Sequence, residues 1–257
     1  MKHITHILIA VMMLTGCSES KQDVNPDDIP VIEAVYDGRL DIIEKHLANG
    51  ALVNKKHDDQ SSNTLLHIAA QSNQEEIVKF LLENGADLNI RNADSNTPLH
   101  LAVARDHFEI TFILITAGAD IDTKGTGGWT SLHLAAYMGH VDIANHLVSH
   151  KGADLHIKDD GGSTALHCAA LKGHDTIIKL LFLKDAEINA LDKEKLTPLD
   201  AAIIGGNKES EELIRRLGGK TFDVTFQELD IIRESFQTSL EGLYHQRVLY
   251  PDITEEE

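Results

Sequence analysis

The stretch Trp129-Thr-Ser-Leu-His-Leu-Ala-Ala-Tyr-Met-Gly-His140 contains a pattern that the rest of the chain repeats. Its Thr-x-Leu-His core recurs at Thr64–His67, Thr97–His100 and Thr164–His167, and in a weaker form at Thr197–Asp200. The threonines lie 33, 33, 34 and 33 residues apart. Self-similarity at this period is typical of small structural units that bury their apolar faces only by stacking on one another.

The repeated motif resembles the signature of the ankyrin-repeat family, Thr-Pro-Leu-His-x-Ala at a period of about 33 residues. The resemblance covers residues 29–219. It implies an all-α fold, an ankyrin-repeat solenoid of about six helix-turn-helix units with hairpin-like turns. The first unit, which starts near Ile29, lacks the motif and is degenerate, and the charged sixth unit suits a terminal cap.

Local sequence rules agree with this plan. Each threonine can cap a first helix with its hydroxyl, and Pro98 and Pro198 fit the first helical position, where no N–H is needed. Asp185 stands where other repeats end their second helix with glycine, and we expect this replacement to cost stability. Those glycines can adopt the left-handed conformation; they are Gly85, Gly118 and Gly152.

The first 28 residues have a different character. Residues 1–16 carry Lys2 and then an apolar run that is too short to span a bilayer, which is the layout of a secretory signal. Leu14-Thr15-Gly16-Cys17 resembles a bacterial lipobox, in which the cysteine thiol is acylated. This resemblance implies lipid attachment at Cys17, with residues 17–28 as a flexible tether and an outer-membrane location facing the periplasm. The alternative is an ordinary cleaved signal peptide.

The C-terminal segment, residues 220–257, contains a second amphipathic pattern and an acidic tail. Thr225 and Glu228 fit a capping box at the start of a helix over residues 225–245. Apolar residues then recur at three- and four-residue steps: Phe226, Leu229, Ile232, Phe236, Leu240 and Leu243. This helix either covers the last repeat or binds a partner or a second copy of the chain.

The net charge of −18 restricts the classes of partner. Nucleic-acid binding needs a basic face, and the sequence shows none. An anionic membrane surface repels the body of such a protein, so membrane association rests on the lipid anchor alone. If charge selects a protein partner, it selects one with a basic surface; the alternative is that the acidity maintains solubility.

The 15 histidines do not indicate a metal site. His67, His100, His133 and His167 are equivalent positions in successive repeats, about 8–10 Å apart, whereas zinc ligands lie within about 2.3 Å of one ion. In ankyrin repeats this histidine steadies the turn, and the same interpretation applies to a second group: His107, His140 and His174. The sequence shows no nucleophile–base arrangement, phosphate-binding loop or Cys-x-x-Cys pair. We therefore expect no enzymatic activity, no cofactor, no metal and no small-molecule substrate.

The resemblance implies that partners bind the concave face, at the turn tips and first-helix ends. At these positions we expect four residues to form an apolar cluster across repeats four and five: Trp129, Tyr137, Met138 and Leu171. Aromatic residues rimmed by polar ones are typical interface anchors, although Trp129 could instead pack on its own turn and only stabilise the fold. Basic residues at the same positions complete the candidate site: Arg91, Arg105, Lys124, Lys158 and Lys172.

The sequence therefore predicts a non-catalytic protein-binding module, lipid-anchored in the bacterial envelope, that recognises a folded protein. Within this class, one alternative is an inhibitor or immunity protein for a secreted toxin or lipase. An acidic receptor could capture a basic toxin, with association weakened by salt. A different class, a hydrolase or metal-binding protein built on the solenoid, has no supporting motif.

Overall fold

The fold was established from a computed structural model, which describes residues 30–57, 61–150 and 152–221. These residues form six pairs of α-helices and no strand. The first helices of the pairs are α2 (Val31–Tyr36), α4 (Leu65–Gln71), α6 (Pro98–Ala104), α8 (Ser131–Met138), α10 (Ala165–Lys172) and α12 (Pro198–Gly205). The second helices are α3 (Leu40–Ala48), α5 (Glu75–Glu83), α7 (Phe108–Ala117), α9 (Val141–His150), α11 (Asp175–Leu183) and α13 (Lys208–Arg216).

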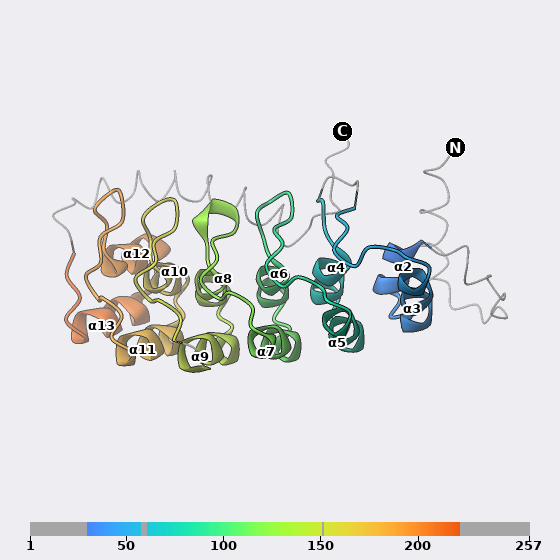
Figure 1. The fold of residues 1–257 in the computed structure, drawn as a ribbon. Helices are drawn as coiled ribbons and strands as arrows, with labels where there is room; N and C mark the ends of the chain where they lie inside the picture. Colours follow the sequence, from blue (N-terminus) through green and yellow to red (C-terminus); the bar gives the residue numbers. More distant parts are fainter. Residues whose placement is uncertain (1–29, 58–60, 151, 222–257) are drawn as a thin grey trace, which may run out of the picture.

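The pairs stack side by side into an elongated solenoid. Figure 1 shows the first helices in one row, the second helices in a row beneath them, and the hairpin loops projecting from the first row on the opposite side. The hairpin between α7 and α8 contains a short 3-10 turn, η2 (Thr126–Gly128). The predicted all-helical solenoid of about six units is confirmed.

Threonine begins each first helix from α4 onward, as predicted. The backbone N–H of Thr130 donates to Nδ1 of His133 at 3.3 Å, and the Thr130 hydroxyl accepts from the His133 backbone N–H at 3.4 Å. Asp200 replaces histidine in the last unit and makes the same local bonds, because its carboxylate accepts from the Thr197 N–H at 2.9 Å. Such a cap contributes about 1 kcal/mol to helix stability. Pro30 precedes α2 without a side-chain cap, which fits a degenerate first repeat.

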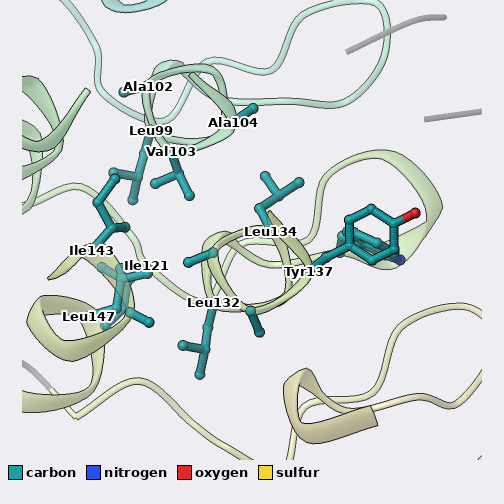
Figure 2. Close-up of a cluster of buried hydrophobic side chains, with 14 of the residues drawn as sticks. Leu99, Ala102, Val103, Ala104, Ile121, Leu132, Leu134, Tyr137, Ile143 and Leu147 are labelled. Atoms are coloured by element: carbon teal, nitrogen blue, oxygen red, sulfur yellow. The ribbon is translucent and has the colours of Figure 1, made fainter. Parts of the chain in front are cut away.

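One apolar core runs through the whole stack. In Figure 2, Leu99 and Val103 of α6 lie near Ile143 and Leu147 of α9 between neighbouring units, and Leu132 of α8 points to the opposite side of its helix. All five are at most 2% exposed. A unit that shares its core with both neighbours has no independent stability, so adjacent repeats stabilise one another. The same core includes Cys168, a free and buried cysteine.

The closing residue of the fifth second helix is the predicted weak point. Asp185 has φ = 66°, in the left-handed region, whereas Gly85 and Gly118 occupy equivalent positions with φ = 81° and 102°. We expect Asp185→Gly to raise the free energy of unfolding by about 1 kcal/mol, because glycine has no Cβ to strain there. Urea unfolding measures this, with Gly85→Asp as the opposite control. An unchanged midpoint for both variants would contradict the expectation.

The predicted signal peptide, tether, lipid attachment at Cys17 and C-terminal helix over residues 225–245 lie outside the described residues. Within the described ranges, every helix is too short or too polar to cross a bilayer.

Candidate protein-binding surface

The hairpin loops form one continuous edge of the molecule (Figure 1). Each loop is closed across its base, as where the Asp159 N–H donates to the Ser163 carbonyl at 2.9 Å. Adjacent loops are also joined, as where the Asp160 N–H donates to the Gly127 carbonyl at 2.9 Å. We define the hairpin face as the C-terminal ends of the first helices together with the described loop residues 55–57, 61–63, 91–96, 124–129, 158–163 and 191–196.

Three of the predicted basic contact residues tie neighbouring loops together. Lys124 Nζ donates to the Lys158 carbonyl and Lys158 Nζ donates to the Leu191 carbonyl, each at 2.7 Å. Arg91 donates from Nη2 to the Lys124 carbonyl in the same way. Their side chains remain exposed, so the surface carries a row of cations at the repeat spacing. The sequence predicted their exposure but not these bonds between repeats.

The predicted aromatic pair lies together but below the surface. Trp129 is 3% exposed and Tyr137 is 5% exposed. Their ring centroids are 5.0 Å apart in an edge-to-face arrangement. Lys172 Nζ lies 4.6 Å from the Tyr137 ring centroid, a cation–π contact that leaves the lysine exposed. Trp129 is therefore packed into the fold, and its ring supports this part of the hairpin face from beneath.

The other predicted residues are more accessible than this pair. Met138 ends α8, and both Met138 and Leu171 are half-buried. Leu171 packs against the main core and also against a small separate cluster of Leu196 and Ile204. Arg105 is also half-buried and follows α6. The accessible apolar surface here therefore comes from aliphatic and thioether side chains.

The motif histidines link each repeat to the next one. His100 accepts from the Thr97 N–H at Nδ1, at 3.2 Å, so its Nε2–H donates to the Trp129 carbonyl 3.1 Å away. His133 bonds to the Ser163 carbonyl at the same distance. His67 and His167 repeat this arrangement. The predicted local role is present, but these histidines also hold the next hairpin.

Burial keeps these imidazoles neutral. Burial lowers the pKa of His67, His100 and His133 to about 4, although the carbonyl that each ring contacts acts in the opposite direction. Burial likewise lowers the pKa of His167. A neutral ring has one donor and one acceptor, which is the pattern that the threonine and the next carbonyl require.

A second row of hydrogen bonds joins the starts of the second helices to the preceding repeat. His107 Nε2 contacts the Gln71 carbonyl and His174 Nε2 contacts the Tyr137 carbonyl, each at 3.0 Å. His140 differs, because its Nδ1 lies 3.3 Å from the Asp106 carboxylate instead. These three histidines therefore act in stacking, and their regular spacing was the only sequence signal for it.

Charge is divided unequally between the two sides of the stack. The described loops of the hairpin face carry seven basic and five acidic residues. The second helices and the loops 84–90, 118–123, 152–157 and 184–190 carry 17 acidic and seven basic residues. The argument from net charge to a basic partner therefore applies to the second-helix side, not to the hairpin face.

A groove that the sequence did not indicate lies on the second-helix side between α7 and α9. Its lining includes Phe108, Asp142 and His146. Phe112 is 45% exposed, with its ring centroid 5.1 Å from that of His146. Helix α7 carries apolar residues on its outer as well as its inner face, which is the one sequence signal for an apolar outer patch.

The row of loop cations leads to a stability prediction. We expect Lys158→Met to lower the free energy of unfolding by roughly 0.5–1 kcal/mol, because one charged hydrogen bond between repeats is lost at an exposed site. Urea unfolding with an unchanged m-value measures this. Lys179→Met is the matched control, since Lys179 is exposed on α11 and its side chain makes no hydrogen bond to the described residues. Equal effects of the two substitutions would contradict a specific role of Lys158.

Within the described ranges, no three histidine, cysteine or carboxylate side chains are placed to hold a metal ion. The buried histidines contact carbonyl oxygens and threonines rather than one another. Burial raises the pKa of the Cys168 thiol far above its usual value, which disfavours the nucleophilic thiolate. The described arrangement thus offers a binding surface.

Comparisons with known proteins agree with this architecture. A family profile described as ankyrin repeats (3 copies) matches residues 132–227, and one described as ankyrin repeats (many copies) matches residues 31–82 and 66–115. The chain is 41% identical over 59 residues to human transient receptor potential cation channel subfamily A member 1. The matched residues make up 23% of this chain and 5% of that protein. It is 36% identical over 61 residues to an ankyrin repeat-containing protein of Schizosaccharomyces pombe, which covers 24% of this chain and 28% of that protein.

The chain thus spans less than a third of the length of either relative. Proteins built from such repeats are generally non-catalytic binding modules, which supports binding of a protein partner. Motif, helix pairs and family profiles lead to the same conclusion: this chain belongs to the ankyrin-repeat family.

Proposed function

We propose that this protein is a non-catalytic binding module, anchored by a lipid on Cys17 in the bacterial envelope, that holds a folded protein on its hairpin face. The observation that carries the proposal is the hairpin face itself, a continuous edge whose loops are fixed to one another by backbone, histidine and lysine hydrogen bonds. A surface that is rigid before binding loses little conformational entropy on association.

The anchor and location rest on the sequence of the first 28 residues. Leu14-Thr15-Gly16-Cys17 supports acylation of Cys17, and the polar residues 18–28 support a tether. About ten extended residues reach roughly 33 Å, which holds the repeats close to the membrane without contact. The proposed location is the outer membrane, with the repeats facing the periplasm.

A pull-down from envelope extract with residues 18–257 tests the binding function. We expect a specific protein to be recovered and to be lost on Lys172→Glu, because this exposed lysine ends α10 on the hairpin face. The matched control is Lys179→Glu on the second-helix side. Recovery that depends on Lys179 and not on Lys172 would contradict the proposed face.

Membrane fractionation tests the anchor separately. We expect the full chain to sediment with membranes and Cys17→Ser to remain in the soluble fraction, because one side chain carries the whole attachment. Membrane association of Cys17→Ser equal to that of the unsubstituted chain would contradict lipid anchoring.

The charge of the second-helix side favours one specific version of this function. An inhibitor or immunity protein for a secreted toxin or lipase would gain from the 17 acidic residues there, which attract a basic protein over long range. Such an association weakens as salt rises. A recovered partner with a basic surface and a toxic or lipolytic activity that is suppressed in the complex would support this version.

A further inference from the structure

The hairpin face combines cations with accessible apolar side chains in a chain of net charge −18. Lys124, Lys158, Lys172 and Lys193 are exposed along it. Leu191 is 39% exposed in the last described hairpin, next to the bond that closes its base. Asp160 and Glu194 lie on the same loops, so the surface is mixed but less acidic than the rest of the described chain. Such a surface is suited to an amphipathic segment that carries negative charge.

The chain itself contains a segment of this kind. Residues 222–257 carry nine acidic and two basic residues. The apolar residues from Phe226 to Leu243 recur at helical spacing, which predicts one apolar stripe. Charge and apolar pattern therefore both match the hairpin face.

The segment also starts next to this face. The Lys220 N–H donates to Asn189 Oδ1 at 2.7 Å. In an earlier repeat the Asp120 N–H makes the equivalent bond to Asn89 Oδ1, where the chain turns toward its hairpin. The Lys220 carbonyl accepts from the Thr197 hydroxyl at 2.7 Å, at the base of the last hairpin. The chain thus leaves the stack at the position where a further hairpin would begin.

The length of the segment is sufficient to reach the cations. Residues 226–243 as a helix would be about 27 Å long at 1.5 Å per residue. Stacked repeats lie about 8–10 Å apart, so such a helix covers roughly three of them. From the sixth repeat this reaches back to the fourth, where Lys124 lies on the loop before α8.

Electrostatics decides between the hairpin face and the groove between α7 and α9 on the second-helix side. Glu109 is exposed beside Phe108 and Phe112 on α7, and Asp142 lines the groove. An acidic segment is repelled there and attracted by the lysines of the hairpin face. On α13, Arg215 is already paired with Glu211. This pairing reduces the attraction of the acidic segment to the last repeat.

We propose that residues 222–257 dock along the hairpin face of the same chain, with the apolar stripe on Met138, Leu171 and Leu191 and the carboxylates against Lys124, Lys158, Lys172 and Lys193. The docked segment covers the surface that we assign to partner binding, so a partner has to displace it. Docking within the chain does not depend on the lipid anchor or on any partner, and its test uses neither.

Carbodiimide cross-linking of the full chain locates the segment, because this reagent joins a carboxylate to an amine only when the two are in contact. A mixture of unlabelled and ¹⁵N-labelled chains distinguishes links within one chain from links between chains by mass. We expect links within one chain from Glu228, Asp230 or Glu234 to lysines of the hairpin face. Links only to lysines of the second helices such as Lys179 or Lys208, links only between chains, or no links from the segment would each overturn the proposal.

Hydrogen exchange provides a second readout without changing the hairpin face. The triple substitution Glu228→Gln, Asp230→Asn and Glu234→Gln is expected to increase exchange of the amides of residues 124–129 and 158–163 by roughly tenfold, since several charge pairs are lost together. The matched control, Glu75→Gln with Glu76→Gln and Glu83→Gln on α5, removes the same charge from the other side. Equal exchange rates in the two triple variants would overturn the proposal.

Discussion

Lowering the pH from 7 to 5 is expected to reduce the free energy of unfolding of the repeat stack by several kcal/mol. His67, His100 and His133 have folded-state pKa values of about 4, against about 6.5 in an unfolded chain. Between these values the unfolded state binds more protons, so stability falls as the pH falls. At pH 5 each of these histidines lowers the free energy of unfolding by about 2 kcal/mol. The three together approach the total stability of an ordinary domain.

The sign follows from the direction of the pKa shift. A lowered histidine pKa means that the folded state favours the neutral ring. The stabilisation of the folded state by this neutral ring is complete above pH 6.5 and disappears toward pH 4. His167 acts in the same direction. Burial raises the pKa of Asp122 and Asp159, and their protonation at low pH acts in the opposite direction. The four buried histidines outnumber these two partly buried carboxylates, so destabilisation prevails.

Urea unfolding at half-unit steps from pH 7 to pH 4.5 measures the slope of stability against pH. His100→Gln should reduce this slope by about 1.4 kcal/mol per pH unit, the contribution of one proton. His156→Gln is the control, because His156 is exposed in a loop between repeats. A midpoint that stays constant from pH 7 to pH 5 would contradict neutral burial of the motif histidines.

The parts of the fold that depend on neighbours in sequence were predictable. Thr64 and His67 lie three residues apart, so their capping bonds form within one helical turn. Pro98 and Pro198 occupy the first helical turn for the same local reason. Five occurrences of such a local pattern defined the repeat unit, and from it the stacked helix pairs.

The bonds between repeats were not predictable, because they require the stacking geometry. The Nε2 atom of His67 reaches the Asn96 carbonyl, 29 residues further along the chain. Lys124 and Lys158 looked like free surface cations because nothing in the sequence places a carbonyl 33 or 34 residues away against their amines. The sequence therefore placed these residues in the loops and at the first-helix ends, and partner binding there stays a prediction. The bonds that fix these positions could not be predicted from the sequence.

Trp129 shows how a loop conformation changes the role of a residue. Of the equivalent residues, Asn63, Asn96 and Ser163 are polar and Leu196 is apolar, so comparison of the repeats did not decide whether this position is buried. In the structure, Gly127 and Gly128 have φ = 64° and 76°, and the turn that they form directs the indole onto Tyr137. Asp160 contacts the Gly128 backbone so closely that a Cβ on residue 128 would lie 2.7 Å from the Asp160 nitrogen.

We expect Trp129→Ala to lower the free energy of unfolding by about 3–5 kcal/mol, the cost of removing a large buried aromatic side chain. The loss includes the edge-to-face contact with Tyr137, 5.0 Å between centroids, and the packing of the loop that supplies the carbonyl for His100. Circular dichroism during urea unfolding measures this loss, since the substitution removes the only tryptophan.

The same variant separates stability from recognition. Because Trp129 is 3% exposed, the molecules that remain folded should bind the partner recovered from envelope extract with unchanged affinity. Lys172→Met is the complementary variant: it removes an exposed cation–π contact, costs at most about 1 kcal/mol of stability, and should weaken binding. If Trp129→Ala instead weakened binding without loss of stability, the indole would have to leave its pocket to contact the partner. The hairpin face would then rearrange on binding rather than act as a rigid surface.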